Sequence, residues 1–362
     1  MKPRLMVDIH LDLSYNAIDF NRDLRWPLER IRRSELGMKD QPFRARGTVC
    51  FPEMRRGRVG LCVATQLARY VDPFSRMPGW RSPEQAWAFT QAQHAWHLEM
   101  ERVGELRQLR TGTEVRQHAE RWIQSEDADT AHLPIGYVLS LEGADSILSW
   151  KHLETAFGYG LRLLGPVHYG PGIYGQGTDA LGPLTPRGRD LLREMRRLGI
   201  ILDATHLSDE SFEDALRHWD GPVWASHSNC RALAHWNRQF DDDQIRELAR
   251  RDAVIGMAFD AIMMVHGWIH LQSRPQDFQL RLARIVEHMD HICQITGSAR
   301  HLAIGSDLDG GFGTEQTPMD LDSIADLGLI ADLLSARGYA AADIESIFHG
   351  NAVRFLAENL PQ

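Results

Sequence analysis

Histidine and carboxylate side chains recur at the ends of short apolar runs in this sequence. The first run ends in His10-Leu11-Asp12, and a later one ends in Glu142-Gly143. His206 and His227 follow two further runs, and Asp307 follows the last. Imidazole nitrogens and carboxylate oxygens suit zinc and related divalent metals. Because two cations about 3.5–4 Å apart can share a bridging carboxylate and a bridging hydroxide, this set has the chemistry of a two-metal hydrolytic site.

Taken singly, each of these signals is weak. A histidine at a strand end is often structural, and an aspartate there often caps the next helix. His10 and Asp12 are separated by one residue, so on a strand their side chains point the same way and can share one metal. Ligand-type residues follow five different runs, and this coincidence predicts a common site.

Eight apolar runs must position these residues. Most are continuous in hydrophobicity, as expected for strands buried on both faces. The predicted strands are residues 5–10, 59–65, 135–141, 161–167, 200–205, 223–226, 254–258 and 301–305. Helical patterns lie between most of them, with Thr185 as the predicted N-cap of the helix at 186–198. Other predicted helices are 83–107, 114–123, 278–297 and 321–337.

Eight strands alternating with helices predict a parallel (β/α)8 barrel with an N-terminal insertion and extra C-terminal helices. The chain has 362 residues, more than the roughly 250 that are typical of this fold. The surplus falls in residues 11–58, in the helical region 83–127, and in the helices from residue 341 onward. No linker rich in Pro, Gly or Ser divides the chain, so we expect one domain over residues 1–362. The carboxyl ends of barrel strands form one face, where the candidate ligands would converge.

Composition narrows the class of protein. Charged residues make up 25% and hydrophobic residues 43%, which is typical of globular proteins. The net charge of -9 argues against a nucleic-acid or anionic-membrane partner. No stretch resembles a membrane span or a secretory signal. The four cysteines, with no CxxC pair, predict isolated thiols in a reducing cytoplasm; they are Cys50, Cys62, Cys230 and Cys293.

A set of motifs, in order and along nearly the whole chain, resembles the membrane (renal) dipeptidases, peptidase family M19 of the amidohydrolase superfamily. The opening motif is Asp8-Ile9-His10-Leu11-Asp12, and the strand-end motifs are Ser140-Leu141-Glu142-Gly143 and Ala225-Ser226-His227-Ser228-Asn229. Further matching segments are residues 51–60, 184–188, 198–208, 305–310 and 349–356. Together these motifs are specific, although no single one is.

The resemblance implies two zinc ions per chain. It assigns His10 and Asp12 to the first metal, and His206 and His227 to the second. It makes Glu142 the carboxylate that bridges both ions.

The resemblance also implies three further site residues. His168 matches the family's substrate-binding histidine and can donate a hydrogen bond to a developing oxyanion. Arg238 matches the arginine that holds the substrate carboxylate, for which a guanidinium offers a fork of donors. Asp307 matches the acid/base residue that moves a proton from water to the leaving amine. The alternatives are that His168 only orders its glycine-rich loop, that Arg238 is a surface charge, and that Asp309 is the acid/base group.

Two departures from the family pattern leave the substrate preference open. Leu11 stands where the family has Asn, and Gln239 stands where Asn follows the substrate-binding arginine. Residues 12–46 match poorly, and their arginines predict a solvated or interface helix rather than a polyanion site. These arginines are Arg25, Arg30, Arg32 and Arg33.

The predicted function is therefore a zinc-dependent dipeptidase. It would hydrolyse dipeptides, including those with a C-terminal D-residue, by a metal-bridged hydroxide. One alternative is a related dinuclear metal hydrolase acting on an N-acyl amino acid, a lactone or a β-lactam. Another is a non-catalytic metal-binding protein. The expected partners are the small dipeptide substrate and a second copy of the chain in a homodimer.

Overall fold

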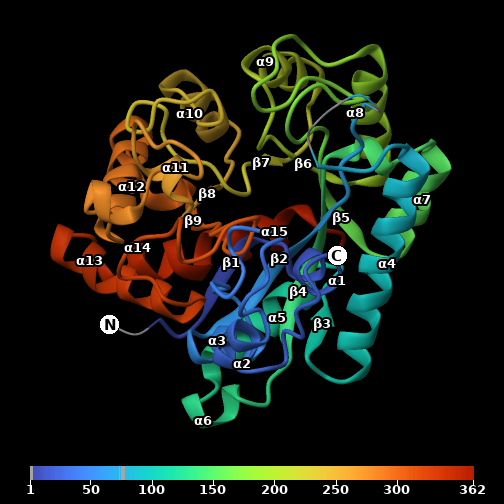
Figure 1. Ribbon diagram of the computed structural model, residues 1–362. Coiled ribbons are helices and arrows are strands. Elements are labelled where there is room, and N and C mark those ends of the chain that lie inside the picture. Colours follow the sequence, from blue (N-terminus) through green and yellow to red (C-terminus); the bar gives the residue numbers. More distant parts are fainter. Residues whose placement is uncertain (1–2, 73, 75–77) are drawn as a thin grey trace.

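Parallel strands run through the centre of the fold, and helices surround them (Figure 1). The computed structural model describes residues 3–72, 74 and 78–362. Neighbouring strands follow the order β7-β6-β5-β4-β2-β1-β9-β8. These strands are β1 (Met6–Leu11), β2 (Val59–Leu67), β4 (Ile135–Glu142), β5 (Leu161–Gly165), β6 (Ile201–Asp203), β7 (Val223–Trp224), β8 (Ile255–Met257) and β9 (Leu302–Ile304).

The two ends of this strand order meet. The backbone N–H of Ala225, just after β7, donates to the carbonyl of Val254 at 3.0 Å. The N–H of Gly256 in β8 donates back to the carbonyl of Ala225 at 2.8 Å. These bonds join β7 to β8 and bring the parallel sheet round into a barrel. The predicted (β/α)8 barrel is confirmed.

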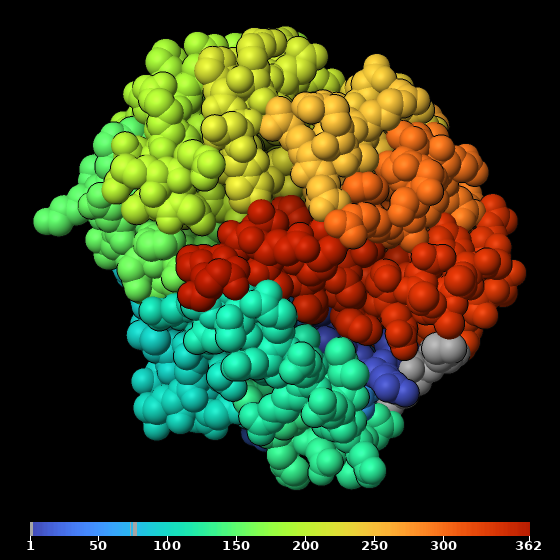
Figure 2. Space-filling model, turned by 180° about the vertical axis from the view of Figure 1, so that it is seen from behind, coloured from blue at the N-terminus to red at the C-terminus, as the bar shows by residue number. Residues whose placement is uncertain are grey.

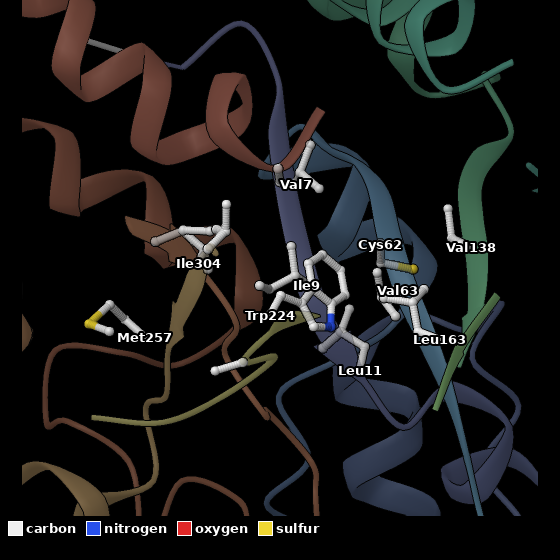
Figure 3. Close-up of a cluster of buried hydrophobic side chains, with 14 of the residues drawn as sticks. Val7, Ile9, Leu11, Cys62, Val63, Val138, Leu163, Trp224, Met257 and Ile304 are labelled. Carbon is white, nitrogen blue, oxygen red and sulfur yellow. The ribbon is translucent and has the colours of Figure 1, made fainter. Parts of the chain in front are cut away.

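The strands are buried on both faces, as their continuous hydrophobicity predicts. All six residues of β1 are buried. Ile9 and Leu11 of β1 lie among buried side chains from other strands, including Trp224 of β7 and Ile304 of β9 (Figure 3). His10 and Asp12 lie at the carboxyl end of this buried strand, where the barrel fold places the candidate ligands.

The helices lie between and around the strands. Thr185 caps α8 as predicted, since its side chain accepts a hydrogen bond from the N–H of Gly188. The helices are α1 (Leu13–Ile18), α2 (Leu28–Ser34), α3 (Phe51–Arg56), α4 (Pro83–Arg102), α5 (Gly112–Gln124), α6 (Asp127–Thr130), α7 (Trp150–Gly158), α8 (Pro186–Leu198), α9 (Asp209–His218), α10 (Asp242–Arg250), α11 (Ala261–Met264), α12 (Ala283–Thr296), α13 (Ile330–Arg337), α14 (Ala341–Glu345) and α15 (Asn351–Asn359).

Three predicted helices were too long. The helix predicted over 83–107 ends at Arg102, because Gly104 adopts a left-handed φ of 82° that breaks the helix. The next residues form an additional short strand, β3 (Leu106–Gln108), which pairs with the start of β4. The helices predicted over 278–297 and 321–337 begin later, at Ala283 and Ile330, after single 3₁₀ segments.

The C-terminal segment covers one end of the barrel. Figure 2 shows it crossing the middle of one face of the molecule. The side-chain amide of Asn351 in α15 donates to the carbonyls of Ala299 and Leu302, where β9 begins. Phe355 of α15 stacks on Trp224 with ring centroids 5.5 Å apart. The segment therefore packs where β9 starts, and the carboxyl ends of the strands are left to carry the site.

Three of the four arginines for which a solvated surface was predicted, Arg25, Arg30 and Arg33, are exposed, and Arg32 is half-buried. Arg25 forms an exposed ion pair with Asp23 at 2.7 Å. The guanidinium of Arg30 lies 3.8 Å from the ring centroid of Trp26. In the part of the chain that the structure describes, all four cysteines are free, and no helix is long and apolar enough to cross a membrane.

Candidate metal centre

The strand ends deliver the candidate ligands to one place. His10 lies at the end of β1, and Glu142 is the last residue of β4. Gly143 then turns the chain with a left-handed φ of 77°, a conformation that glycine adopts without strain. His206 and Asp307 adopt φ values of 69° and 59° without that freedom. Eight other non-glycine residues in the described part of the chain also have positive φ, so these two are marked by their position at strand ends beside the cluster and not by backbone conformation alone.

Glu142 lies between the three candidate histidine ligands. Its Oε1 is 2.9 Å from Nε2 of His206 and 3.5 Å from Nε2 of His227. Its Oε2 is 3.9 Å from Nε2 of His10. Glu142 is therefore the one predicted ligand whose carboxylate faces both halves of the candidate pair of sites, which suits a bridging role.

Asp12 and Asp307 complete the cluster around His10. Nε2 of His10 is 3.9 Å from Oδ1 of Asp12 and 3.7 Å from Oδ1 of Asp307. Oδ2 of Asp307 is 3.9 Å from Nε2 of His227. Asp12 occupies the N-cap position of α1, but its side chain makes no capping hydrogen bond. The carboxylate of Asp12 thus serves the cluster rather than the helix.

Each candidate histidine ligand contacts a hydroxyl through its outer nitrogen. A hydroxyl can accept a hydrogen bond from Nδ1–H, and in that tautomer the lone pair of Nε2 is free for a metal. The three pairs are His10 with Thr65 at 3.4 Å, His206 with Thr178 at 2.8 Å, and His227 with Ser226 at 2.9 Å.

The donor set fits divalent cations. Nε2 of His10, Oδ1 of Asp12 and Oε1 of Glu142 are buried and find no hydrogen-bond partner in the described part of the chain. Buried polar atoms are rarely left unpaired, because desolvation without a partner is costly. Three such atoms among close nitrogen and oxygen neighbours match the ligand chemistry of zinc and similar metals.

Burial sets the charge state of the cluster. It lowers the pKa of His10 to about 3 and holds the pKa of His206 and His227 well below the usual value. Neutral imidazole is the form that binds metal. Burial raises the pKa of Asp12 to about 7, and burial and the charge of Asp12 raise that of Glu142. Crowded carboxylates of this kind are stabilised in their ionised form by bound cations.

Arg238 lies beside the cluster and not on the surface. It is only 4% exposed, so the alternative of a surface charge is wrong. Nη2 donates to the carbonyl of His227 at 2.9 Å, and Nη1 lies 3.4 Å from Oγ of Ser228. Nε of Arg238 is buried and finds no partner among the described residues. The guanidinium therefore keeps a donor available for a ligand.

His168 faces the cluster from the loop after β5. Its Nε2 is 3.7 Å from Oε2 of Glu142. Its ring meets the ring of His206 edge-on, with centroids 4.4 Å apart. Burial and the neighbouring charge of Arg69 hold the pKa of His168 well below its usual value. All eight predicted site residues thus lie around one centre.

The sequence model of the membrane dipeptidases, peptidase family M19, matches residues 1–360. The chain belongs to this family. It is accordingly an enzyme, a hydrolase of the metallo-dipeptidase class. The family resemblance predicted from the motifs is confirmed.

Known proteins share its sequence and fold. An uncharacterised protein from the pqqA 5′ region of Klebsiella pneumoniae is 29% identical over 231 residues, 61% of this chain and 81% of that protein. An uncharacterised dipeptidase of Schizosaccharomyces pombe is 29% identical over 171 residues, 47% of this chain and 39% of the yeast protein. A metallo peptidase from Rhodobacter sphaeroides, solved with a phosphinate mimic of the dipeptide L-Ala-D-Ala, shares the fold, with a TM-score of 0.76, 23% identity and 99% of both chains covered.

Within this M19 chain, Asp309 has a structural environment. Oδ1 accepts from the N–H and the hydroxyl of Thr48 at 2.7 and 2.8 Å. Oδ2 accepts from the N–H of Val49 at 3.1 Å and from Arg22 at 3.2 Å. With four donors on its two oxygens, Asp309 ties the N-terminal insertion to the end of β9. This leaves Asp307 as the better candidate for acid/base chemistry.

We expect Asp309→Asn to destabilise the M19 fold. The amide would face backbone donors that need an acceptor, and Arg22 would lose one of its charge partners, so the free energy of unfolding should fall by about 3 kcal/mol. Urea unfolding measures this. Asp322→Asn is the control, because Asp322 is exposed and its pair with Arg32 should contribute less than about 1 kcal/mol. Equal stability of the two variants would contradict the anchoring role.

Two aspartates that sequence reasoning left without a role hold the ligand-bearing strands together. Oδ1 of Asp8 accepts from the N–H groups of His10 and Ser306, which links β1 to the end of β9. Oδ1 of Asp203 accepts from the N–H groups of Thr205 and Ser226, which links β6 to the end of β7. Each aspartate precedes a candidate ligand by two or three residues. That spacing was the feature of the sequence from which a role in positioning the ligands could have been predicted.

Sequence reasoning also missed Asp260 and Arg69. Asp260 follows β8 and accepts from Nε2 of Gln316 at 2.8 Å. Burial raises its pKa to about 7, and its charge contributes to the raised pKa of Asp307. Arg69 follows β2 and donates to His168. Its position four residues beyond the strand predicted over 59–65 was a signal, but one shared by many surface arginines.

Proposed function

We propose that this M19 enzyme is a zinc-dependent dipeptidase with two metal ions per chain, and that it accepts dipeptides with a C-terminal D-residue. The observation that carries the proposal is the position of Glu142 between two ligand groups, next to a buried arginine with a free donor. His10 and Asp12 would hold one ion, and His206 and His227 the other. Glu142 would contact both.

Two bound divalent cations would activate a water molecule and polarise the scissile carbonyl. The protein's own contribution is to hold three groups around that carbonyl. Nε2 of His168 points toward Glu142 and is placed to donate to the oxygen that becomes negative. Asp307 would take the proton of the attacking water and deliver it to the leaving amine.

Position supports Asp307 in the acid/base role. Its Oδ1 lies 3.7 Å from Nε2 of His10, and its Oδ2 lies 3.9 Å from Nε2 of His227. The carboxylate therefore faces the space between the two candidate ligand groups, where it could take a proton from an attacking water.

Arg238 would select substrates by length. A buried guanidinium beside the metal centre can grip a free carboxylate one residue beyond the scissile bond. In a longer peptide a neutral amide would stand in that place and leave the arginine unpaired. The acceptance of a C-terminal D-residue is supported by the related Rhodobacter sphaeroides peptidase, which was solved with a mimic of L-Ala-D-Ala.

The proposal is tested by comparing a dipeptide with its C-terminal amide. We expect amidation to lower kcat/KM by about 30- to 5,000-fold, which corresponds to roughly 2–5 kcal/mol for a buried charge pair. Arg238→Met should impose a similar loss on the free acid. The variant should then lose little more with the amide, because the interaction is already gone.

The stereochemistry and the substrate class are tested with a panel of L,L and L,D dipeptides, each assayed with zinc-loaded protein. Turnover of L,D members supports the proposed stereochemical tolerance. Equal turnover of acid and amide by the wild type would contradict the carboxylate clamp. A failure to cleave any dipeptide, with cleavage of N-acyl amino acids, lactones or β-lactams instead, would overturn the proposed substrate.

A further inference from the structure

Arg69 contacts the outer nitrogen of His168. Its Nη2 lies 2.8 Å from Nδ1 of His168, and its Nε donates to the same nitrogen at 3.2 Å. The guanidinium carbon lies 5.4 Å from the ring centroid of Tyr169, the next residue in the chain. Two donors and an aromatic ring therefore hold the arginine and the imidazole in one arrangement.

This contact determines which nitrogen of His168 carries a proton. A guanidinium has five N–H donors and no acceptor, so Nδ1 of His168 must be the acceptor. A neutral imidazole that accepts at Nδ1 carries its proton on Nε2. That nitrogen faces Glu142 and the metal centre. His168 therefore presents an N–H group to the site.

The three candidate ligands have the opposite arrangement. Their Nδ1 atoms face the hydroxyls of Thr65, Thr178 and Ser226, which can accept a hydrogen bond from Nδ1–H and leave Nε2 with a free lone pair. Four imidazoles thus surround one centre, and only His168 has a partner that cannot accept. The hydrogen bond on the outer nitrogen separates the metal-binding histidines from the donating one.

We propose that Arg69 is a positioning residue that keeps His168 as an Nε2–H donor and prevents it from becoming a further metal ligand. This inference rests on the proposed dipeptidase function, in which His168 donates to the scissile carbonyl. Without Arg69, His168 could adopt the other tautomer, lose its donor and offer a lone pair to the metals.

Kinetics test the positioning role in the zinc-loaded enzyme. Arg69→Met should lower kcat by about 10–100-fold, the usual cost of losing an outer hydrogen-bond partner of a site histidine. The KM should change little, because the ground-state contacts of the substrate remain. Arg69→Lys keeps a donor and should recover most of the kcat. In a His168→Ala variant, adding Arg69→Met should lower kcat almost no further. If the arginine were purely structural, the two losses of kcat would be independent and their free energies would add.

Nitrogen-15 NMR of the histidine rings gives a readout that does not depend on turnover. The His168 signals, assigned by their absence in His168→Ala, should show a protonated Nε2 in the wild type and in Arg69→Lys. Arg69→Met should shift them toward the other tautomer or toward a metal-bound nitrogen. Arg55→Met is the matched control, because Arg55 is partly buried, pairs with Glu105 and donates to the carbonyl of Leu133, before the start of β4 and away from the site; it should leave the signals unchanged.

The outcomes separate the two proposals. A protonated Nδ1 in the wild type, or unchanged His168 signals in Arg69→Met, would overturn the role of Arg69. If the wild type shows the expected signals but cleaves no dipeptide, the assigned tautomer stands and the proposed function fails. If Arg69→Met lowers kcat equally with and without His168, the arginine acts by another route and the positioning role is wrong.

Discussion

Asp307→Asn is expected to lower kcat by about 10²–10⁴-fold, the usual contribution of a general acid–base group. The amide has nearly the same shape but cannot take a proton from water and pass it to the leaving amine. Steady-state kinetics on a dipeptide, together with elemental analysis of the same preparation, measure the effect.

The metal content decides what the loss of activity means. The oxygens of Asp307 lie within 3.9 Å of Nε2 of His10 and of His227, so the same side chain is also close enough to belong to the metal cluster. If Asp307 is the acid/base group, Asp307→Asn should keep both ions and lose turnover. A variant that loses a metal would make Asp307 a ligand instead.

A near-normal kcat in Asp307→Asn would remove the residue from the mechanism. In that case Asp309 would be the next candidate from the sequence, although its four hydrogen bonds leave it poorly suited. Asp309→Asn therefore serves as a comparison here, with unfolding measured alongside turnover. Loss of stability together with retained activity per folded molecule is the result we expect for Asp309.

Glu142→Gln is expected to reduce the metal content from about two ions per chain to one or fewer, and to lower kcat by more than about 10³-fold. Glu142 is the only predicted ligand that both ions would share, so its neutralisation should weaken the binding of both. Elemental analysis after reconstitution with zinc, and isothermal titration of the metal, measure the change.

His206→Ala provides the comparison for Glu142→Gln. His206 belongs to one ligand group, so its loss should empty one site and leave the other occupied. Glu142→Gln should weaken binding at both sites in a titration. A wild-type protein that saturates firmly at one ion per chain would contradict the bridging role of Glu142, and equal titration curves for the two variants would do so as well.

Much of the barrel and of the site was predictable from the sequence, because apolar runs mark the strands and polar residues at their ends mark the site. Strands buried on both faces must be continuously apolar, so runs such as the one that ends at His10 stand out in the sequence. In a parallel barrel every strand ends on the same face, so polar residues at those ends must converge whatever the details of packing. For this reason, the location of Glu142 and His227 at the carboxyl ends of predicted strands was enough to place them in the site.

The sequence alone therefore determined which strands carry chemistry and which side chains stand at their ends. Only the tertiary structure decided how those side chains are used. Two sets of hydrogen bonds come from segments distant in the sequence. Asp309 accepts from Thr48, Val49 and Arg22. His168 accepts from Arg69. The physical reason is that a hydrogen bond depends on distance and direction between atoms. No pattern along one segment shows which partner will lie there, and that partner decides whether a histidine binds a metal or donates a hydrogen bond.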